Sequence, residues 1–476
     1  MLVTERYRPE QPLDQLGTEF ADAVRPADFP RLTLRHRNQR VAERLGLERL
    51  DDAQWTQHFG RLDPLPGAQA KRLALRYHGH QFRTYNPDLG DGRGFLLAQL
   101  REAPSGRLSD LSTKGSGRTP YSRGGDGRLT LKGGVREALA TAMLEALGAP
   151  TSDTLSLVET GEALQRSDEP SPTRACVLVR RTYSSIRFGT FQRHAFHDRK
   201  DLLTALTRHV LAVYHPDLAT AADPAAALLG RVVERTATLT AGWMLAGFVH
   251  GVLNTDNMNI NGESFDYGPY RFLPRNDPNF VAAYFDQNGL YAFGRQPEAV
   301  FWNLNQLAGA LSLISTDEAL AEALNRFSTL YREAMTAGML RRLGLKSSGA
   351  AADQDLVQSA FRALATGGDE LRWEPFFFDW FCGLASQARA MSGPRSALYD
   401  QEAFLAFRAR LVVFEADRPE RLVSPYFARR DPEELLLPEI EAVWRDIAER
   451  DDWTAFQVKL AAIEGARRAY DFEVQR

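Results

Sequence analysis

Short apolar runs alternate with glycine-rich turns over residues 76–190. The runs GFLLAQL (94–100), LSDLSTKG (108–115) and CVLVRRTY (176–183) are typical of β-strands. Between the second and third runs, segment 133–149 carries apolar residues at helical spacing, and we expect this helix to end at Gly148. The pattern predicts the order strand, strand, helix, strand.

After about residue 200 the pattern is mostly helical, with a loop-rich interruption at 250–297. One long helix is predicted over 315–343, where Ser315 and Glu318 form a capping-box pair at its start. A further helix is predicted near the N-terminus, over 37–50. A small mixed α/β part followed by a larger helical part indicates a nucleotide site in the cleft between two lobes.

Composition and charge exclude some partners but identify no function. The chain has 476 residues, 44% of them hydrophobic and 25% charged, which is typical of globular proteins with room for two or three packed units. Basic and acidic residues are interspersed and the net charge is -3, so nucleic acid and anionic membranes are unfavoured partners.

Cysteine usage and hydropathy bear on location. Cys176 and Cys382 are too few and too far apart for a disulfide framework, which favours a reducing compartment. No apolar run approaches the roughly 20 residues of a membrane helix. The N-terminus lacks the apolar stretch of a secretory signal, and its early acidic residues argue against a transit peptide. We therefore predict a cytoplasmic protein.

The first motif with chemical meaning combines a glycine-rich turn with a lysine and a glutamate. GDGRG (90–94) precedes the first strand, and glycines let a backbone approach phosphate closely. Lys114 ends the next run, and Glu137 lies early in the following helix, where we expect it at the cleft within reach of water. Kinases hold a lysine against ATP phosphates with such a glutamate. The alternative is a simple turn, an exposed lysine and a solvated glutamate.

The second motif is HGVLNTDN (250–257), followed by FDYG (265–268). Compared with the kinase loop H-R-D-x-x-x-x-N, His250 takes the histidine position and Asn257 that of the metal-binding asparagine. Asp266 matches the metal-chelating aspartate of D-F-G. The combination predicts an α+β, protein-kinase-like, two-lobed fold with a small mixed α/β N-lobe and a larger, mostly helical C-lobe.

The position of the kinase catalytic aspartate is occupied by Val252. An apolar side chain neither accepts nor orients a hydroxyl proton, so ordinary phosphotransfer is disfavoured. The chain is then either an inactive nucleotide binder or an enzyme with different chemistry. Asp256 is the only acid in this loop and becomes the candidate base, and the alternative is an aspartate that caps the loop.

Five blocks of the sequence together resemble a known family. They are HGHQFRTYNPDLGDGRG (78–94), KGSGRTPYSRGGDGR (114–128), IRFGTF (186–191), HGVLNTDNM (250–258) and FDYGPY (265–270). They are similar to the signature blocks of selenoprotein O, a family of kinase-fold protein adenylyltransferases, and the resemblance runs from about residue 75 to 310. It implies that ATP binds inverted, with the γ-phosphate buried and the α-phosphate facing the acceptor. The expected activity is transfer of AMP from ATP to Ser, Thr or Tyr hydroxyls of proteins.

The resemblance also implies roles for individual residues. The nucleotide site would comprise Gly90, Gly92, Arg93, Lys114, Asp126, Gly127, Arg180, Arg187 and Asp266, with Glu137 as the ion-pair partner of Lys114. Asn257 and Asp266 would hold Mg²⁺ or Mn²⁺, and Asp256 would be the base. Arg180 and Arg187 match the arginines that hold the buried phosphate end, a role that suits guanidinium groups because they bind phosphate bidentately and stay charged when desolvated.

The sequence departs from the family in two places. It ends at YDFEVQR without the cysteine or selenocysteine tail common in the family, so we expect no redox control from such a residue. Leu290 and Arg295 stand where an arginine and an asparagine are usual, which indicates different acceptor recognition. Of the neighbouring His78 and His80, only His80 matches the family block, so we interpret the pair as structural rather than metal-binding.

The sequence predicts four segments and leaves alternatives open. The segments are an N-terminal extension (1–75), a nucleotide-binding N-lobe (76–190), a C-lobe with the catalytic and metal loops (191–345) and a helical C-terminal extension (346–476). Predicted partners are ATP and proteins that bear acceptor hydroxyls, and the chain itself is a further candidate acceptor. The alternatives are an inactive ATP-binding pseudokinase scaffold and UMP transfer from UTP.

Overall fold

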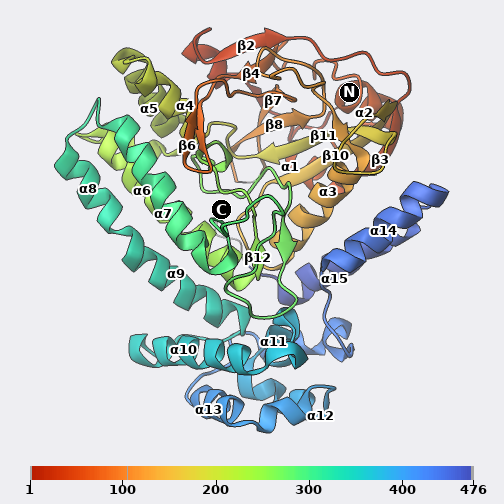
Figure 1. Cartoon of the computed structure of the whole chain (residues 1–476), viewed down its shortest axis with the longest axis vertical. Helices are drawn as coiled ribbons and strands as arrows, with labels where there is room; N and C mark the ends of the chain where they lie inside the picture. The colour runs from red at the N-terminus through yellow and green to blue at the C-terminus, as the bar shows by residue number, and fades with distance from the viewer. Residues whose placement is uncertain (1–2, 104, 473–476) are drawn as a thin grey trace.

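The computed structural model describes residues 3–103 and 105–472, which form a large antiparallel sheet followed by a mostly helical part (Figure 1). The sheet order is β2-β4-β7-β8-β11-β10-β3, with β1 paired to β7 and β9 paired to β11. Its strands are β1 (Pro9–Glu10), β2 (Ala21–Val24), β3 (Thr33–Arg37), β4 (Arg72–Leu75), β7 (Leu96–Arg101), β8 (Leu108–Lys114), β9 (Leu129–Thr130), β10 (Asp153–Leu164) and β11 (Thr173–Thr182). The end of the chain, part of YDFEVQR, lies outside the described residues.

The three predicted strands are confirmed as β7, β8 and β11, but the prediction omitted β10. This strand pairs with β11 on one edge and with β3 on the other. Its apolar residues, such as Leu155 and Leu157, are separated by polar ones, and tertiary cover on both faces buries most of the strand. The observed order is therefore strand, strand, helix, strand, strand, with the short β9 before the helix.

The helix that packs on this sheet is α3 (Leu131–Ala146). It starts at Thr130, whose hydroxyl accepts a hydrogen bond from the backbone N–H of Gly133. As predicted it ends just before Gly148, which has a φ of +76°. The helix has a fully buried stripe that includes Leu139. This stripe belongs to the same hydrophobic cluster as Trp243 of the second lobe, so the helix packs on both lobes.

The predicted helix over 315–343 is two helices, α8 (Asp317–Asn325) and α9 (Phe327–Arg342). Thr316, not Ser315, caps α8, and its hydroxyl accepts from the N–H of Ala319. Ser315 instead donates to Asp223, the N-cap of the long helix α6 (Pro224–Leu245). The break at Arg326 lets both helices pack against α6. The predicted helix over 37–50 is also shorter, because α1 (Gln39–Leu45) ends at Gly46 with a φ of +72°.

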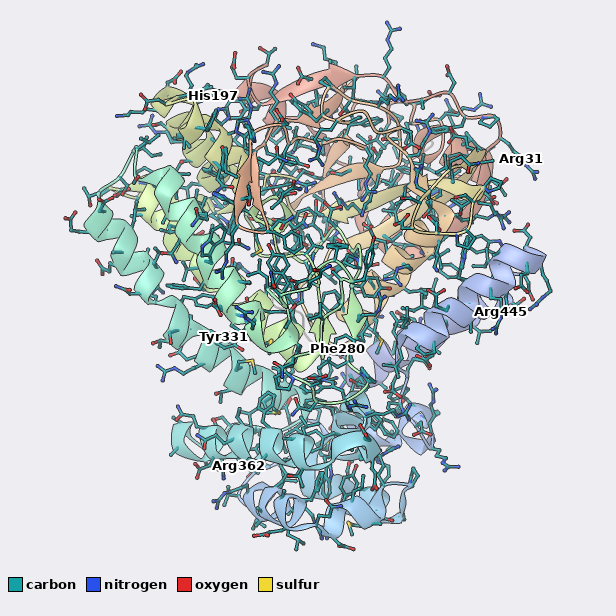
Figure 2. The ribbon with its side chains drawn as sticks, viewed as in Figure 1. Arg31, His197, Phe280, Tyr331, Arg362 and Arg445 are labelled. Atoms are coloured by element: carbon teal, nitrogen blue, oxygen red, sulfur yellow. The ribbon has the colours of Figure 1, made fainter. Side chains whose placement is uncertain are left out.

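Of the other helices, α2 (Asp52–Phe59) packs on β3 and β10 of the sheet, and the rest complete the second lobe and an outer layer. They are α4 (Phe188–Phe196), α5 (Lys200–Tyr214), α7 (Gln296–Leu311), α10 (Ala350–Thr366), α11 (Trp373–Asp379), α12 (Gln387–Ser392), α13 (Glu402–Leu411), α14 (Leu437–Arg450) and α15 (Thr454–Tyr470). Helix α15 returns along the sheet part and packs on α3. Arg362 on α10 and Arg445 on α14 are exposed at the periphery (Figure 2).

The predicted fold class, α+β with two kinase-like lobes, is confirmed. Strands β2, β3 and β4, from the first 75 residues, belong to the same sheet as the strands of 76–190. The division into four segments stays a prediction. Among the described residues, no helix combines the length and apolar character needed to cross a membrane.

Candidate active site

A cavity of about 700 Å³ lies between the sheet and the loops that follow α6. The short paired strands β12 (Phe248–Val249) and β13 (Arg271–Phe272) flank those loops. The predicted site residues that line the cavity are Gly90, Gly92, Arg93, Lys114, Asp126, Gly127, Arg180, Arg187, Asp256, Asn257 and Asp266. Glu137 lies directly behind Lys114. The structure thus brings residues from five distant sequence blocks to one place, while their individual roles stay predictions.

The cavity is strongly basic. The basic side chains that line it outnumber the acidic ones by eight to four: Arg93, Lys114, Arg118, Arg123, Arg128, Arg166, Arg180 and Arg187 against Asp91, Asp126, Asp256 and Asp266. Such an excess of positive charge favours a polyanion such as a nucleoside triphosphate. The overall charge of the chain gives no sign of this local field.

Lys114 and Glu137 form the predicted ion pair. Lys114 ends β8, Glu137 lies on α3, and Nζ is 2.5 Å from Oε2. The expectation that Glu137 reaches water is wrong, because its residue is only 1% exposed. Helix α3 packs flat on the sheet at this point, so the carboxylate faces protein on all sides. Nη1 of Arg180 lies 3.7 Å from the other oxygen, Oε1, and supplies a second positive charge.

Asp266 lies where three cations converge. Its Oδ1 is 3.1 Å from Nζ of Lys114 and 2.8 Å from Nη1 of Arg180, and its Oδ2 is 2.9 Å from Nη1 of Arg187. Burial by itself raises the pKa of this carboxyl, but the three cations outweigh it and hold the pKa well below its usual value. The backbone at Asp266 has a φ of +62°, a left-handed conformation uncommon for a residue other than glycine.

Arg180 and Arg187 are buried, and aromatic rings cover them. The ring of Phe265 lies 5.0 Å from the guanidinium of Arg180 and 4.8 Å from that of Arg187, and Tyr77 lies 4.6 Å from the latter. Burial lowers the pKa of each arginine, but nearby carboxylates and, for Arg187, Tyr77 raise it above its usual value. Both cations are therefore permanently charged and held in fixed positions.

Sequence reasoning missed Asp91, although it lies inside the GDGRG turn. Its Oδ1 is 3.4 Å from Nη2 of Arg187, and its Oδ2 accepts a hydrogen bond from the backbone N–H of Leu75. Burial raises the pKa of Asp91, and Arg187 partly offsets this. The aspartate ties the glycine-rich turn to the arginine. The sequence did contain a signal for Asp91: it is an acidic residue between the two glycines of a turn that we expected to face phosphate.

Asp256 has the properties of a base. It lies in a short 3₁₀ turn (Thr255–Asn257), is 8% exposed, and its Oδ1 has no hydrogen-bond partner among the described residues. Burial raises its pKa to about 6, although Arg187 opposes the shift. A carboxylate that lines the cavity and has this pKa is suited to accept a proton near neutral pH. Val252, the apolar replacement of the kinase aspartate, lines the same cavity.

Asn257 and Asp266 present oxygen atoms that suit a hard divalent cation. Nδ2 of Asn257 donates to the carbonyl of Val252, which leaves its side-chain oxygen available as a ligand. No group of three His, Cys, Asp or Glu side chains is arranged to hold a metal within residues 3–103 and 105–472. Mg²⁺ characteristically takes one or two protein carboxylates together with substrate phosphates and water. The two residues fit that mode, and the metal stays a prediction.

Two loops around the cavity pack closely through glycines. A Cβ on Gly90 would lie 2.3 Å from the ring of Tyr121, and one on Gly127 would lie 2.2 Å from the carbonyl oxygen of Gly117. Asp126 forms an ion pair with Arg166 at 2.8 Å and accepts from the backbone N–H of Arg128, so it fixes the second loop. Any larger residue at either glycine would push the loops apart.

The two early histidines are held by hydrogen bonds beside the cavity. Nδ1 of His78 is 2.8 Å from the hydroxyl of Tyr85, and Nδ1 of His80 is 2.9 Å from Nε2 of Gln192. Burial lowers the pKa of His78 to about 4 and lowers that of His80 as well. Both are therefore neutral near pH 7, and the structural interpretation stays a prediction.

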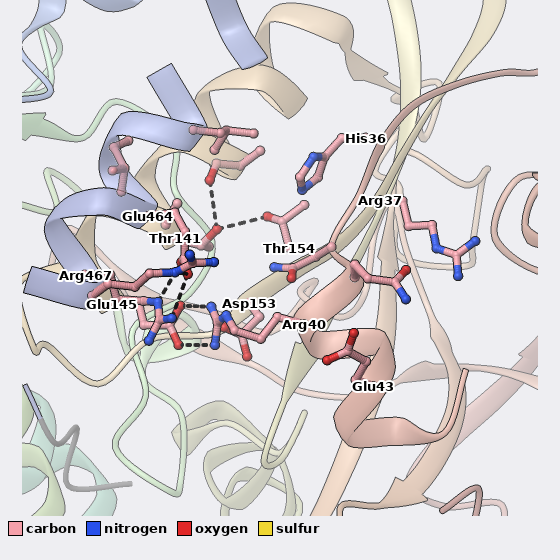
Figure 3. Close-up of a pocket in the computed structure, with 17 residues that line it drawn as sticks. His36, Arg37, Arg40, Glu43, Thr141, Glu145, Asp153, Thr154, Glu464 and Arg467 are labelled. Atoms are coloured by element: carbon pink, nitrogen blue, oxygen red, sulfur yellow. Dashed lines mark hydrogen bonds and ion pairs between the residues drawn. The ribbon is translucent and has the colours of Figure 1, made fainter. Parts of the chain in front are cut away.

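A second cavity, of about 460 Å³, lies between α1, α3 and α15 (Figure 3). Its lining has four basic side chains, Arg37, Arg40, Arg467 and Arg468, and four acidic ones, Glu43, Glu145, Asp153 and Glu464. Arg40 binds both oxygens of Glu145, and Arg467 binds both oxygens of Glu464 (Figure 3). With its charges balanced, this cavity lacks the positive field of the first one and is not the candidate active site.

A two-lobed kinase-like fold, a basic cleft and a buried lysine–glutamate pair define a nucleotide-binding protein of the kinase-like class. Comparison with known proteins gives the family. The family model described as "Protein adenylyltransferase SelO" matches residues 2–464, so the chain belongs to this family. The predicted family and the predicted enzyme class, nucleotidyltransferase, are confirmed.

Similar proteins match the chain over nearly its whole length. It is 44% identical over 470 residues to "Protein nucleotidyltransferase YdiU" of Synechocystis sp., which covers 94% of this chain and 96% of the relative. It is 45% identical over 458 residues to the protein of the same name from Gloeobacter violaceus, with 93% and 92% covered. The protein of that name from Trichormus variabilis is 40% identical over 477 residues, with 97% and 96% covered.

Proposed function

We propose that the chain transfers AMP from ATP to Ser, Thr or Tyr hydroxyls of proteins and releases pyrophosphate. The observation that carries the proposal is the placement of Arg180 and Arg187, two buried arginines that both contact Asp266 in the basic cavity. Fixed, desolvated guanidinium groups suit the charge-rich terminal phosphate. With the γ-phosphate held there, the α-phosphorus is the reactive centre left for an acceptor.

Asp256, which lines the cavity, would take the proton of the acceptor hydroxyl. The hydroxyl oxygen then attacks the α-phosphorus, and the bond from that phosphorus to the α–β bridging oxygen breaks. Pyrophosphate leaves with the electron pair, and Lys114 would stabilise its charge. Asn257 and Asp266 would hold Mg²⁺ or Mn²⁺, which supplies further stabilisation of phosphate charge. Val252 leaves the usual kinase base position without an acid.

The proposal is tested by following two labels. With Mg²⁺ or Mn²⁺, label is expected to reach protein from α-³²P-ATP and not from γ-³²P-ATP. Arg180→Ala and Arg187→Ala are expected to lower transfer by about 10²-fold or more, as when one charge-stabilising contact is removed. Arg199→Ala is the matched control, since Arg199 pairs with Asp201 at the surface and is expected to leave transfer unchanged.

The same assay separates the alternatives. Label from the γ position would show an ordinary kinase with a displaced base. No label from either position, together with measurable ATP binding, would show a pseudokinase scaffold. Parallel reactions with α-³²P-UTP compare UMP transfer with AMP transfer, and intact-mass analysis of the chain itself reports self-modification. The cytoplasmic location stays a prediction.

A further inference from the structure

Three exposed aromatic side chains, Phe82, Tyr284 and Phe285, form a surface next to the catalytic loop, which we call the aromatic edge, and the ring of the buried Tyr291 contacts Phe82. The ring centre of Phe82 lies 5.9 Å from that of Phe285 and 5.1 Å from that of Tyr291. Tyr284 lies 5.1 Å from Phe285. Phe82, Tyr284 and Phe285 are 37%, 82% and 46% exposed. Clustered exposed aromatic rings of this kind mark interaction sites.

Phe82 is held at the edge by a strained turn. Strands β5 (Gly79–Gln81) and β6 (Thr84–Asn86) form a hairpin whose two turn residues, Phe82 and Arg83, have φ values of +50° and +65°. Such turns ordinarily contain asparagine and glycine, because other side chains disfavour positive φ. A bulky aromatic residue at this position costs free energy, so packing of the hairpin alone does not account for it.

The hairpin is attached to the loop that carries Asp256. The backbone N–H of Phe82 donates to Oδ1 of Asn254 at 3.1 Å, and that of His80 donates to Oγ1 of Thr255 at 2.7 Å. A Cβ on Gly79 would lie 3.1 Å from Oδ1 of Asp256. Gln81, between these contacts, lines the basic cavity. The aromatic edge is therefore continuous with the cavity wall at the candidate base.

The charged side chains named here beside the aromatic edge have partners within the protein. Nη2 of Arg83 lies 3.1 Å from Glu298, and its guanidinium lies 5.5 Å from the ring of Trp302. The carboxylate of Asp286 accepts hydrogen bonds from the backbone N–H groups of Leu290 and Tyr291. Arg295 shares Glu298 at 3.8 Å, so these charges are engaged in ion pairs of the protein. An apolar side chain, in contrast, would find three exposed rings.

We propose that the aromatic edge binds an extended segment of the acceptor protein whose apolar or aromatic side chain lies about three residues from the modified hydroxyl. This inference rests on the proposed function, because it places the hydroxyl at Asp256. The spacing follows from the hairpin: Gly79 adjoins Asp256 and Phe82 lies three residues further along, roughly 10 Å at strand spacing. Phe82 and Phe285 would then determine specificity without contacting the nucleotide.

The test uses short synthetic peptides, each with one Ser, Thr or Tyr, that differ only in having Phe, Leu, Ser or Asp at one to four positions on either side. With α-³²P-ATP the protein is expected to label the Phe and Leu peptides about 10-fold more efficiently, as kcat/KM, than the Ser and Asp peptides. Phe82→Ala and Phe285→Ala are expected to remove this preference through the KM for peptide, with the KM for ATP unchanged. Leu405→Ala, an exposed apolar residue on α13, is the matched control.

Phe285→Ala keeps the test decisive if Phe82→Ala disturbs the hairpin, because Phe285 lies on a different segment. Phe82→Tyr is expected to retain the preference. Labelling without any preference for apolar neighbours, or a preference unchanged in both alanine variants, would overturn the inference and leave the proposed function standing. Labelling of folded proteins without labelling of any peptide would also overturn the inference and leave the proposed function standing. Absence of labelling from α-³²P-ATP on any acceptor would overturn both.

Discussion

Nη1 of Arg187 lies 2.9 Å from Oδ2 of Asp266, which connects the start of α4 to the loop after β12. The other oxygen of the same carboxylate contacts Lys114 and Arg180, so residues more than 150 positions apart share one charge cluster. Removal of the carboxylate would leave three buried cations close together. A substitution in this cluster is therefore expected to affect both activity and the stability of the fold.

Asp266→Asn is expected to lower transfer by about 10²–10³-fold, because the variant lacks the carboxylate proposed to hold the metal that stabilises phosphate charge. The variant is also expected to melt at a lower temperature, since buried cations lose their partner. Radiolabel transfer and thermal unfolding measure the two effects. Asp201→Asn, at an exposed ion pair, is the control and should change neither. Full activity of Asp266→Asn with Mg²⁺ or Mn²⁺ would contradict the metal assignment.

Lys114→Met is expected to lose at least about 10²-fold in transfer and to lose stability, because Glu137 is buried and keeps only the more distant Arg180. The double variant Lys114→Met with Glu137→Gln is expected to recover part of the stability and none of the activity. Unfolding midpoints in urea and transfer rates separate these outcomes. Normal turnover in the folded single variant would show that the pair is structural only.

The rate of transfer is expected to fall as the pH decreases through about 6, because Asp256 must be deprotonated to act as a base and burial raises its pKa to about 6. Asp256→Asn is expected to lose at least about 10²-fold in rate and to lose this limb of the pH profile. The measurement is kcat/KM against pH, which reports the pKa of the enzyme without bound substrate. A wild-type profile flat down to pH 4.5 would argue against Asp256 as the base.

Asp256→Asn is expected to be more stable than the wild type at pH 7. The usual pKa of this carboxyl is 3.8 and its folded value is about 6, so the folded chain binds the extra proton between these values. Stability from this group is therefore lost as the pH rises from about 4 to about 6. The difference between these two pKa values corresponds to about 3 kcal/mol in the free energy of unfolding, which is the expected gain in stability of Asp256→Asn at pH 7. The two melting temperatures should converge below about pH 4, and a gain independent of pH would contradict this cause.

Activity is expected to be equal under oxidant and under dithiothreitol. The described part of the chain contains two free cysteines, Cys176 in β11 and Cys382 after α11, and both are buried. Burial raises the pKa of Cys382 to about 11 and raises that of Cys176, so neither forms the reactive thiolate. Slow alkylation of the native protein by iodoacetamide would agree. A reversible loss of activity that disappears in Cys382→Ser would contradict the prediction.

The sequence determined much of the local structure and the members of the site. The strands that became β7, β8 and β11 follow from local hydrophobic pattern, and α3 follows from its apolar spacing and the glycine at its end. The site residues lie in motifs whose chemistry is local: glycines before a strand, and an asparagine and an aspartate at kinase-like spacing. These signals need no knowledge of distant contacts.

Only the tertiary structure decided the features that depend on contacts between residues far apart in the chain. Strand β10 pairs with β3, which lies far earlier in the chain, and the split into α8 and α9 follows from packing against α6. Burial of Glu137, the three cations on Asp266 and the raised pKa of Asp256 come from residues brought together by folding. Burial and electrostatic fields depend on distance in space, and residue order alone does not contain those distances.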